Sequence, residues 1–211
     1  IAAGTFPISG PFGLVRTQGD YTLRGAVDEF GIAATILDAE GDGRLLTING
    51  GQTSATLIEN IQFINGNREN VGGALGIAES SSPVIRNCIF ENNHTDTNGG
   101  AVYVQGSSPT FDACTFVTNT TAVDGEGGGI YAANSELTVQ FCYFIENTAG
   151  GGGGITFENS GGSEVDATGF WNNNADRGGG IYLGSSDVTF NQCLVEGNTA
   201  AIEGGGLYVY Q

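Results

Sequence analysis

Apolar and polar residues alternate with a period of two in many short segments of this chain. In one of them Ile130 and Ala132 share a face while Tyr131 takes the other. Clusters of Ser, Asn, Gly and Pro separate these segments, as at residues 80–83 and 107–109. No window shows the apolar stripe of an amphipathic helix. The pattern predicts short strands joined by tight turns, without helices.

These segments recur with a nearly constant period. Six times a glycine pair is followed by a small residue and then an apolar one, and the small residues are spaced by 27, 28, 25, 26 and 26 positions. A second motif, Phe-x-x-Asn or a close variant, lies between successive glycine pairs. It ends on Asn93, Asn119, Asn147, Asn173 and Asn198. A fixed period in this range indicates a stacked-repeat architecture.

A unit of two or three short strands cannot bury its apolar face alone. Stacked as coils of a parallel β-helix, equivalent residues lie about 4.7–4.9 Å apart and cover one another. We therefore predict an all-β, right-handed parallel β-helix of about eight coils. Residues 1–54 are expected to form irregular N-terminal coils and residues 55–211 the regular repeats, within one continuous domain.

The two repeated motifs also resemble those of a known family. The glycine-glycine-small-apolar motif and the Phe-x-x-Asn motif are similar to the repeats of the polymorphic outer-membrane proteins, which are bacterial autotransporters, and of other secreted β-helix repeat proteins. Residues 1–6, 34–39 and 43–44 are similar to their first coils. The resemblance implies a β-helix over essentially the whole chain and a role as a surface-exposed passenger, adhesin or structural rod.

Two columns of equivalent residues are expected to stack inside the coils. The five asparagines that end the Phe-x-x-Asn motif predict a corner ladder of side-chain hydrogen bonds. Asn93 and Asn119 also begin N-glycosylation sequons, which an inward position would leave unmodified. Four cysteines share one repeat position, with Thr168 in the gap of their series, and they are expected to act as small buried apolar residues. They are Cys88, Cys114, Cys142 and Cys193. A disulfide between adjacent coils remains an alternative.

Charge and composition limit the classes of partner. The net charge is −17, and all six basic residues are arginines. Nucleic acids and anionic membrane surfaces are therefore excluded as partners, and acidic polysaccharides are repelled unless a cation bridges them. The sequence has no transmembrane run and begins with Ile1, so we expect a processed, secreted or cell-surface protein.

Candidate catalytic groups are sparse. The arginines do not share a repeat position, and Arg86 is expected between Glu59 and Asp112 in an outward charge ladder. Asp112 and Asp166 occupy equivalent positions two coils apart, about 9.6 Å by coil spacing, whereas the two carboxylates of a glycosidase are about 5–5.5 or 6.5–9.5 Å apart. No long loop would enclose that pair, so a solvated strand face is favoured. The single histidine, His94, follows a ladder asparagine at a variable corner position. We expect no enzymatic activity, with a polysaccharide lyase or glycoside hydrolase as an alternative.

Two other groups are candidates for binding. The outward position of the glycine strand carries tyrosine in four repeats and Thr156 in a fifth. These residues are Tyr103, Tyr131, Tyr182 and Tyr208, and they predict a flat ladder that either stacks on sugars or stabilises the sheet. Acidic residues precede the glycine pairs, and their oxygens favour either solubility or calcium binding. They are Asp96, Asp124, Glu126, Asp176 and Glu203. No other cofactor is expected.

The two ends of the repeat series suggest self-association. The last segment, residues 206–210, has the full pattern of a strand, and no amphipathic helix covers the first coil. A bare end coil offers unpaired strand edges to another chain. Either caps have been removed, or the last coil of one molecule stacks on the first coil of the next. We predict an extracellular structural or adhesive rod, able to form a head-to-tail filament. A carbohydrate-binding module that uses the tyrosine ladder is the alternative.

Overall fold

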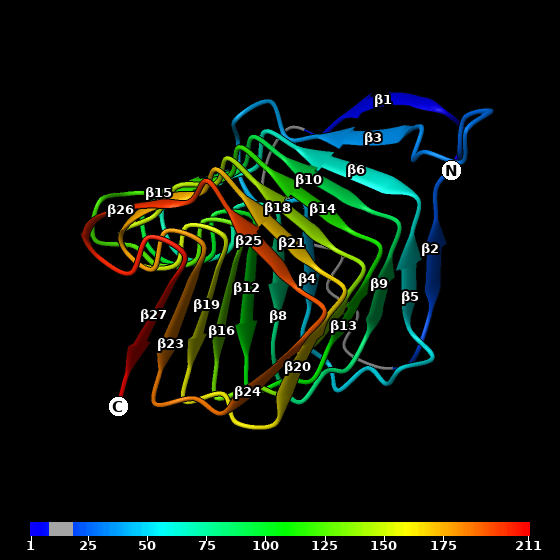
Figure 1. The fold of residues 1–211 in the computed structure, drawn as a ribbon. Helices are drawn as coiled ribbons and strands as arrows, with labels where there is room; N and C mark the ends of the chain where they lie inside the picture. The colour runs from blue at the N-terminus through cyan, green and yellow to red at the C-terminus, as the bar shows by residue number, and fades with distance from the viewer. Residues whose placement is uncertain (9–18) are drawn as a thin grey trace.

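The computed structural model describes residues 1–8 and 19–211 and contains no helix within them. The strands wind into a parallel β-helix of about seven turns, close to the eight predicted (Figure 1). The predicted all-β parallel β-helix is confirmed. The wall of the coil consists of three parallel sheets, which we number 1 to 3, and a side arm projects from it. Along the chain, each regular turn passes through one strand of sheet 3, then sheet 1, then the side arm, then sheet 2.

Sheet 1 is the longest of the sheets in the described part of the chain, and its strands pair in parallel. Its members are β1 (Gly4–Pro7), β3 (Thr35–Asp38), β6 (Ile61–Ile64), β10 (Ile89–Glu91), β14 (Thr115–Val117), β18 (Tyr143–Ile145), β21 (Gly169–Trp171) and β25 (Leu194–Glu196). The middle residue of the regular strands points inward, and its two neighbours point outward.

Sheets 2 and 3 complete the wall. Sheet 2 consists of β4 (Leu46–Ile48), β8 (Leu75–Ile77), β12 (Val102–Gln105), β16 (Ile130–Ala133), β19 (Ile155–Glu158), β23 (Ile181–Gly184) and β27 (Leu207–Tyr210). Sheet 3 consists of β2 (Thr22–Arg24), β5 (Leu57–Glu59), β9 (Val84–Arg86), β13 (Thr110–Asp112), β17 (Thr138–Gln140), β20 (Ser163–Asp166) and β24 (Val188–Asn191).

A side arm projects beyond the body between sheets 1 and 2, where β15 and β26 are labelled in Figure 1. It contains β7 (Asn67–Arg68), β11 (His94–Thr95), β15 (Thr120–Thr121), β22 (Asn174–Arg177) and β26 (Thr199–Glu203). Isolated bridges through Thr148 connect its two short ladders. The glycine pairs then return the chain to sheet 2.

The corners of the coil use left-handed backbone conformations. Ala113, directly after β13, has φ +53°. Asn92, after β10, has φ +54°, and Asn134, after β16, has φ +49°. Asparagine tolerates this region better than most residues do, which accounts for part of its abundance at corners.

The glycine pairs allow the backbones of neighbouring coils to approach one another closely. Gly127 has φ +67°, and a Cβ on Gly128 would lie 2.4 Å from the carbonyl oxygen of Gly153 in the next coil. The first glycine therefore makes the turn, and the second lets two backbones pack directly. Side chains at these positions would force neighbouring coils apart.

A phenylalanine stack fills the core beneath sheet 1. Phe63, Phe90, Phe116, Phe144 and Phe170 are completely buried. Their successive ring centroids are 4.7–5.0 Å apart and their planes within 9° of parallel. This spacing matches that of the strands, so each coil places one ring on the ring before it.

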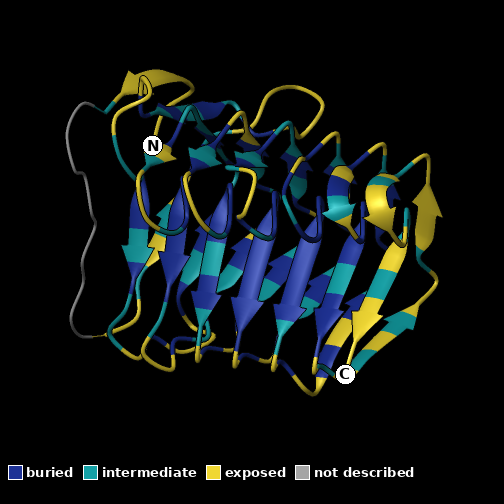
Figure 2. Ribbon diagram, turned by 90° about the vertical axis from the view of Figure 1, so that its left-hand side faces the viewer, coloured by how far each residue is buried: buried dark blue, intermediate teal, exposed yellow. Residues whose placement is uncertain are grey.

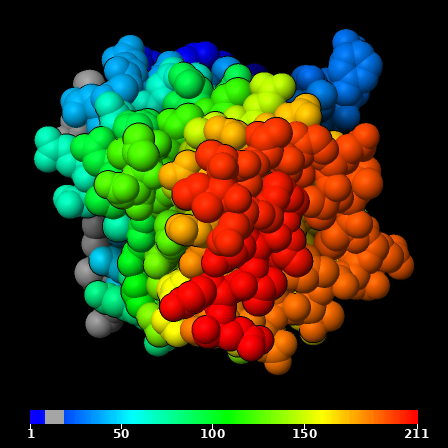
Figure 3. Space-filling view, turned by 60° about the vertical axis from the view of Figure 1, so that its left-hand side comes forward, coloured from blue at the N-terminus to red at the C-terminus, as the bar shows by residue number. Residues whose placement is uncertain are grey.

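Burial decreases toward the last coil, where strands change from blue to yellow (Figure 2). Val195, Leu207 and Val209 occupy inward positions, in register with buried Phe170, Ile181 and Leu183. They are nevertheless 41%, 45% and 50% exposed. The last coils form a broad face of the molecule, red and orange in Figure 3.

The first residues are less regular than the later coils. Antiparallel bridges join Val27 to Ala33 and Gly43 to Asn67, whereas the strand pairs within the sheets are parallel. Sheet 2 begins only at β4.

Candidate functional site

The asparagine ladder is the most regular polar feature of the interior. The Nδ2 of Asn119 donates to Oδ1 of Asn147 at 2.9 Å and to the carbonyl oxygen of Phe90 at 2.9 Å. The same Oδ1 of Asn147 also accepts from the backbone N–H of Asn119. This arrangement repeats from Asn93 to Asn198, so the predicted ladder is confirmed. Asn93 and Asn119 are buried, which removes their sequons from the surface.

The cysteine column stacks as predicted, with one difference. Cys88, Cys114 and Cys142 are buried free thiols, and the backbone N–H of Cys142 donates to Thr168 Oγ1 at 3.3 Å. Cys193, in the last coil, is partly exposed rather than buried. Burial raises the pKa of the Cys88 and Cys142 thiols well above the usual value. These thiols are therefore protonated and weakly nucleophilic at neutral pH.

The tyrosines of the predicted ladder pack in two pairs on sheet 2, Tyr103 with Tyr131 and Tyr182 with Tyr208, and the ladder is partly covered. Tyr103 and Tyr131 stack at 5.6 Å, but Tyr131 is only 8% exposed, and Thr156 in the next coil is fully buried. The turns that lead out of the side arm lie against this column. A Cβ on Gly151, for example, would be 3.4 Å from the Tyr182 ring. Burial raises the pKa of Tyr131 to about 12, and the carboxylates of Glu126 and Glu158 contribute.

The acidic residues of the side arm do not converge on one point. Asp124, Glu126 and Asp176 line a hollow of about 170 Å³ together with Arg177 and Tyr182. Arg177 pairs with Glu203 at 3.5 Å, and Asp96 lies 3.4 Å from His94. Burial, aided by Glu158, raises the pKa of Glu126. No three His, Cys, Asp or Glu side chains in the described residues are placed to hold a metal ion. Calcium binding there stays a prediction.

The outer face of sheet 3 carries the charge ladder that the sequence predicted. Arg86 Nε lies 2.9 Å from Asp112 Oδ2, and Arg24 pairs with Glu59. Gln140 separates Asp112 from Asp166 in the register. Asp166 accepts from Asn191 Nδ2 at 2.7 Å, so both carboxylates already have partners. His94 contacts Thr120 Oγ1 at 2.8 Å in the side arm, and Arg16 lies outside the described residues.

The turns between sheets 2 and 3 form a second ladder, which sequence analysis treated only as loops. The backbone N–H of Ser107 donates to Oγ of Ser135, which in turn donates to the carbonyl oxygen of Ala133. Ser81, Ser135 and Ser160 repeat the backbone-to-hydroxyl bond. The signal was available as a serine at one repeat position in five successive coils, from Ser81 to Ser186.

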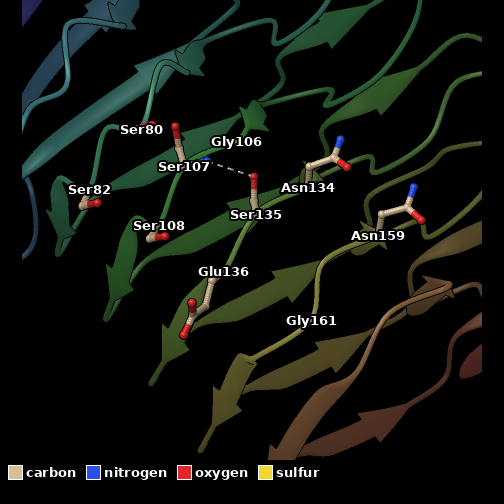
Figure 4. Close-up of a pocket in the computed structure, with 10 residues that line it drawn as sticks. All are labelled: Ser80, Ser82, Gly106, Ser107, Ser108, Asn134, Ser135, Glu136, Asn159 and Gly161. Carbon is tan, nitrogen blue, oxygen red and sulfur yellow. Dashed lines mark hydrogen bonds between the residues drawn. The ribbon is translucent and has the colours of Figure 1, made fainter.

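A hollow of about 540 Å³ lies over this serine ladder (Figure 4). The exposed side chains of Ser108, Asn134 and Asn159 line it, while Ser107 and Ser135 belong to the ladder. Glu136 is the one ionisable residue among the described residues that line it. A carboxylate pair of the glycosidase type needs two such groups, and the described lining of the hollow contains one.

Comparison with protein families fits this geometry. The model described as "Right handed beta helix region" matches residues 42–144 and, overlapping them, 95–211. The chain belongs to the right-handed β-helix family. No curated protein and no solved structure matches it.

This right-handed β-helix also has an aromatic pair on the outer face of sheet 1, which sequence analysis did not identify. Tyr143 and Trp171 have ring centroids 5.4 Å apart and planes inclined by 34°. Both residues flank inward phenylalanines, so strict alternation along β18 and β21 could have placed them outside.

No described helix is long and apolar enough to cross a membrane.

Proposed function

We propose that this β-helix is a non-catalytic structural or adhesive rod that acts outside the cell and grows by stacking coil on coil. The observation that supports the rod best is the ladder of asparagines, which bonds successive coils to one another from Asn93 to Asn198. In the last described coil, the inward residues Val195, Leu207 and Val209 continue buried columns but are themselves exposed. In a solution of the 211-residue chain, these apolar side chains and the strand edge beside them favour contact with a coil of another molecule.

The occupant we propose is the first coil of a second copy. Phe6 at the other end is in register with the inward residue Leu37 and is 36% exposed. A contact between two different ends of the same chain is heterologous, and such contacts produce open filaments when the rotation does not close a ring. The interior ladders favour a rigid unit, because the coils from Asn93 to Asn198 are hydrogen-bonded to one another through both backbone and side chains.

The repeat motifs support a surface location. The glycine-glycine-small-apolar and Phe-x-x-Asn motifs resemble those of polymorphic outer-membrane proteins, and the net charge of −17 suits a solvated extracellular surface. Immunogold labelling of intact source cells tests this part of the proposal. Signal confined to the cell interior would contradict it.

The filament is tested separately from the location. Val209→Arg places a charge at an inward position of β27. We expect this variant to lose the increase of particle size with protein concentration that light scattering measures. Tyr210→Arg is the matched control, because Tyr210 is an outward neighbour on the same strand. Equal growth of both variants would contradict end stacking through this coil.

The non-catalytic part of the proposal has its own test. Pectate, xylan and neutral glucans incubated with the chain should show no new reducing ends and no unsaturated uronides. Release of either product above the buffer control would favour the lyase or hydrolase alternative.

A further inference from the structure

The outer face of sheet 1 differs in chemistry from that of sheet 3. Two outward columns run along sheet 1 from β6 to β25. The first column consists of Gln62, Ile89, Thr115, Tyr143, Gly169 and Leu194. The second column consists of Ile64, Glu91, Val117, Ile145, Trp171 and Glu196. Most are apolar, whereas the corresponding face of sheet 3 carries ion pairs. Tyr143 is 46% and Leu194 51% exposed.

Trp171 lies flat on this face because Gly169 has no side chain. A Cβ on Gly169 would be 2.1 Å from Cη2 and 2.2 Å from Cζ3 of the indole. The ring therefore occupies the empty place in the first column, between Tyr143 and Leu194. Gly169 is buried beneath it, while Trp171 keeps partial exposure. Tyr143, Trp171 and Leu194 thus form a continuous apolar strip across three coils, which we name the aromatic strip.

The charges around the aromatic strip restrict what it can bind. Glu196 pairs with Trp171 in the strand register, and Glu91 lies further along the same column. The five described arginines lie on sheet 3, in the side arm or before β4, and none is on sheet 1. A polyanion would meet carboxylates here without any cation. A neutral ligand with hydroxyl groups would instead find acceptors, because a hydroxyl donates a charge-assisted hydrogen bond to a carboxylate.

We propose that the aromatic strip is a binding site for a neutral polysaccharide whose sugar rings have a flat apolar face. The rings of Tyr143 and Trp171 supply the rigid stacking area. Glu196 accepts hydrogen bonds from the sugar hydroxyls at the strip's edge. The strip crosses the strands, so a polysaccharide on it lies along the axis of the rod. This inference goes beyond the rod proposal and holds even if the chain does not form filaments.

The chain provides its own reporter for this site. Trp171 is the single tryptophan of the sequence, so its fluorescence reports directly on the proposed contact. Three neutral probes, hydroxyethylcellulose, laminarin and glycol chitin, are titrated into the full chain. Carboxymethylcellulose serves as the acidic counterpart of the first. We expect at least one neutral probe to change the emission in a saturable manner, with at least tenfold weaker binding of the acidic probe.

Variants then locate the contact. Each is run on native gels that contain one of the same polysaccharides, and binding is measured as the retardation of the protein band. Tyr143→Ala and Trp171→Ala should each weaken binding at least tenfold. Thr115→Tyr should strengthen it, because Thr115 neighbours Tyr143 in the same column and a tyrosine there lengthens the strip. Phe30→Ala, which removes an exposed aromatic ring outside sheet 1, is the matched control and should leave binding unchanged. Circular dichroism verifies that each variant is folded.

Three results would overturn the proposal. The first is the absence of any emission change or retardation with all three neutral probes. The second is binding that survives Tyr143→Ala in a folded protein. The third is a preference for carboxymethylcellulose, which would place the contact away from the carboxylates of sheet 1.

Discussion

The side-chain amide of Asn119 donates to Oδ1 of Asn147, 2.9 Å away in the next coil. Asn147 repeats the bond to Asn173, and neither side chain reaches solvent. Buried amides therefore bond successive coils to one another at this corner, next to the stacked phenylalanines.

Asn147→Ala should lower the free energy of unfolding by about 1–3 kcal/mol, because partners in the buried corner lose their hydrogen bonds. Asp176→Ala, in the side arm, should stay within about 0.5 kcal/mol of the parent, as surface substitutions usually do. Urea unfolding followed by circular dichroism measures both. Similar small effects of the two substitutions would argue against the ladder as a source of stability.

Gly128→Ala should destabilise the protein far more than Gly161→Ala. A Cβ at position 128 would lie 2.4 Å from a carbonyl oxygen of the next coil, whereas one at position 161 has no atom within 4 Å. Thermal unfolding of the two variants compares them. If Gly128→Ala melts with the parent protein, the glycine pairs do not act through close backbone approach.

Cys114→Val should cost less than about 1.5 kcal/mol, since it nearly conserves volume in the core. Cys114→Asp should prevent folding, because an unpaired charge would be buried. Thiol labelling of the native chain at pH 7 should modify Cys193 first, and mass spectrometry of the peptides identifies the site. Rapid labelling of all four cysteines would show that the column is open.

The stability of the fold should decrease as the pH rises above about 10, the ordinary pKa of tyrosine. The pKa of Tyr131 in the folded chain is about 12. Between these values the unfolded chain releases a proton that the folded chain retains, so alkali favours unfolding. Tyr131→Phe should make the decrease smaller, as measured by urea midpoints at pH 9 and pH 11. An identical decrease in the variant would assign the effect to other groups.

The sequence was sufficient for features that depend on the period alone. Equivalent positions in successive repeats become neighbours in any stacked coil, so the asparagine ladder and the cysteine column followed from spacing. The interrupted alternation between the inward residues Phe111 and Cys114 is likewise a sequence signal for the corner at Ala113. The serine ladder had the same kind of signal.

The remaining site features depend on how the turns fold. The side arm covers Tyr131 because its return turns pack against sheet 2, and alternation along the strand does not reveal that contact. Trp171 lies on the backbone of Gly169, a close approach that one residue pair decides. The exposure of Cys193 depends on its position in the last described coil rather than on its repeat position.

The rod account is tested most directly by electron micrographs of the 211-residue chain at increasing protein concentration. We expect particles of constant width whose lengths increase in steps of one molecule, and Val209→Arg should restore single units. Particles that keep the length of one molecule at every concentration would contradict the account.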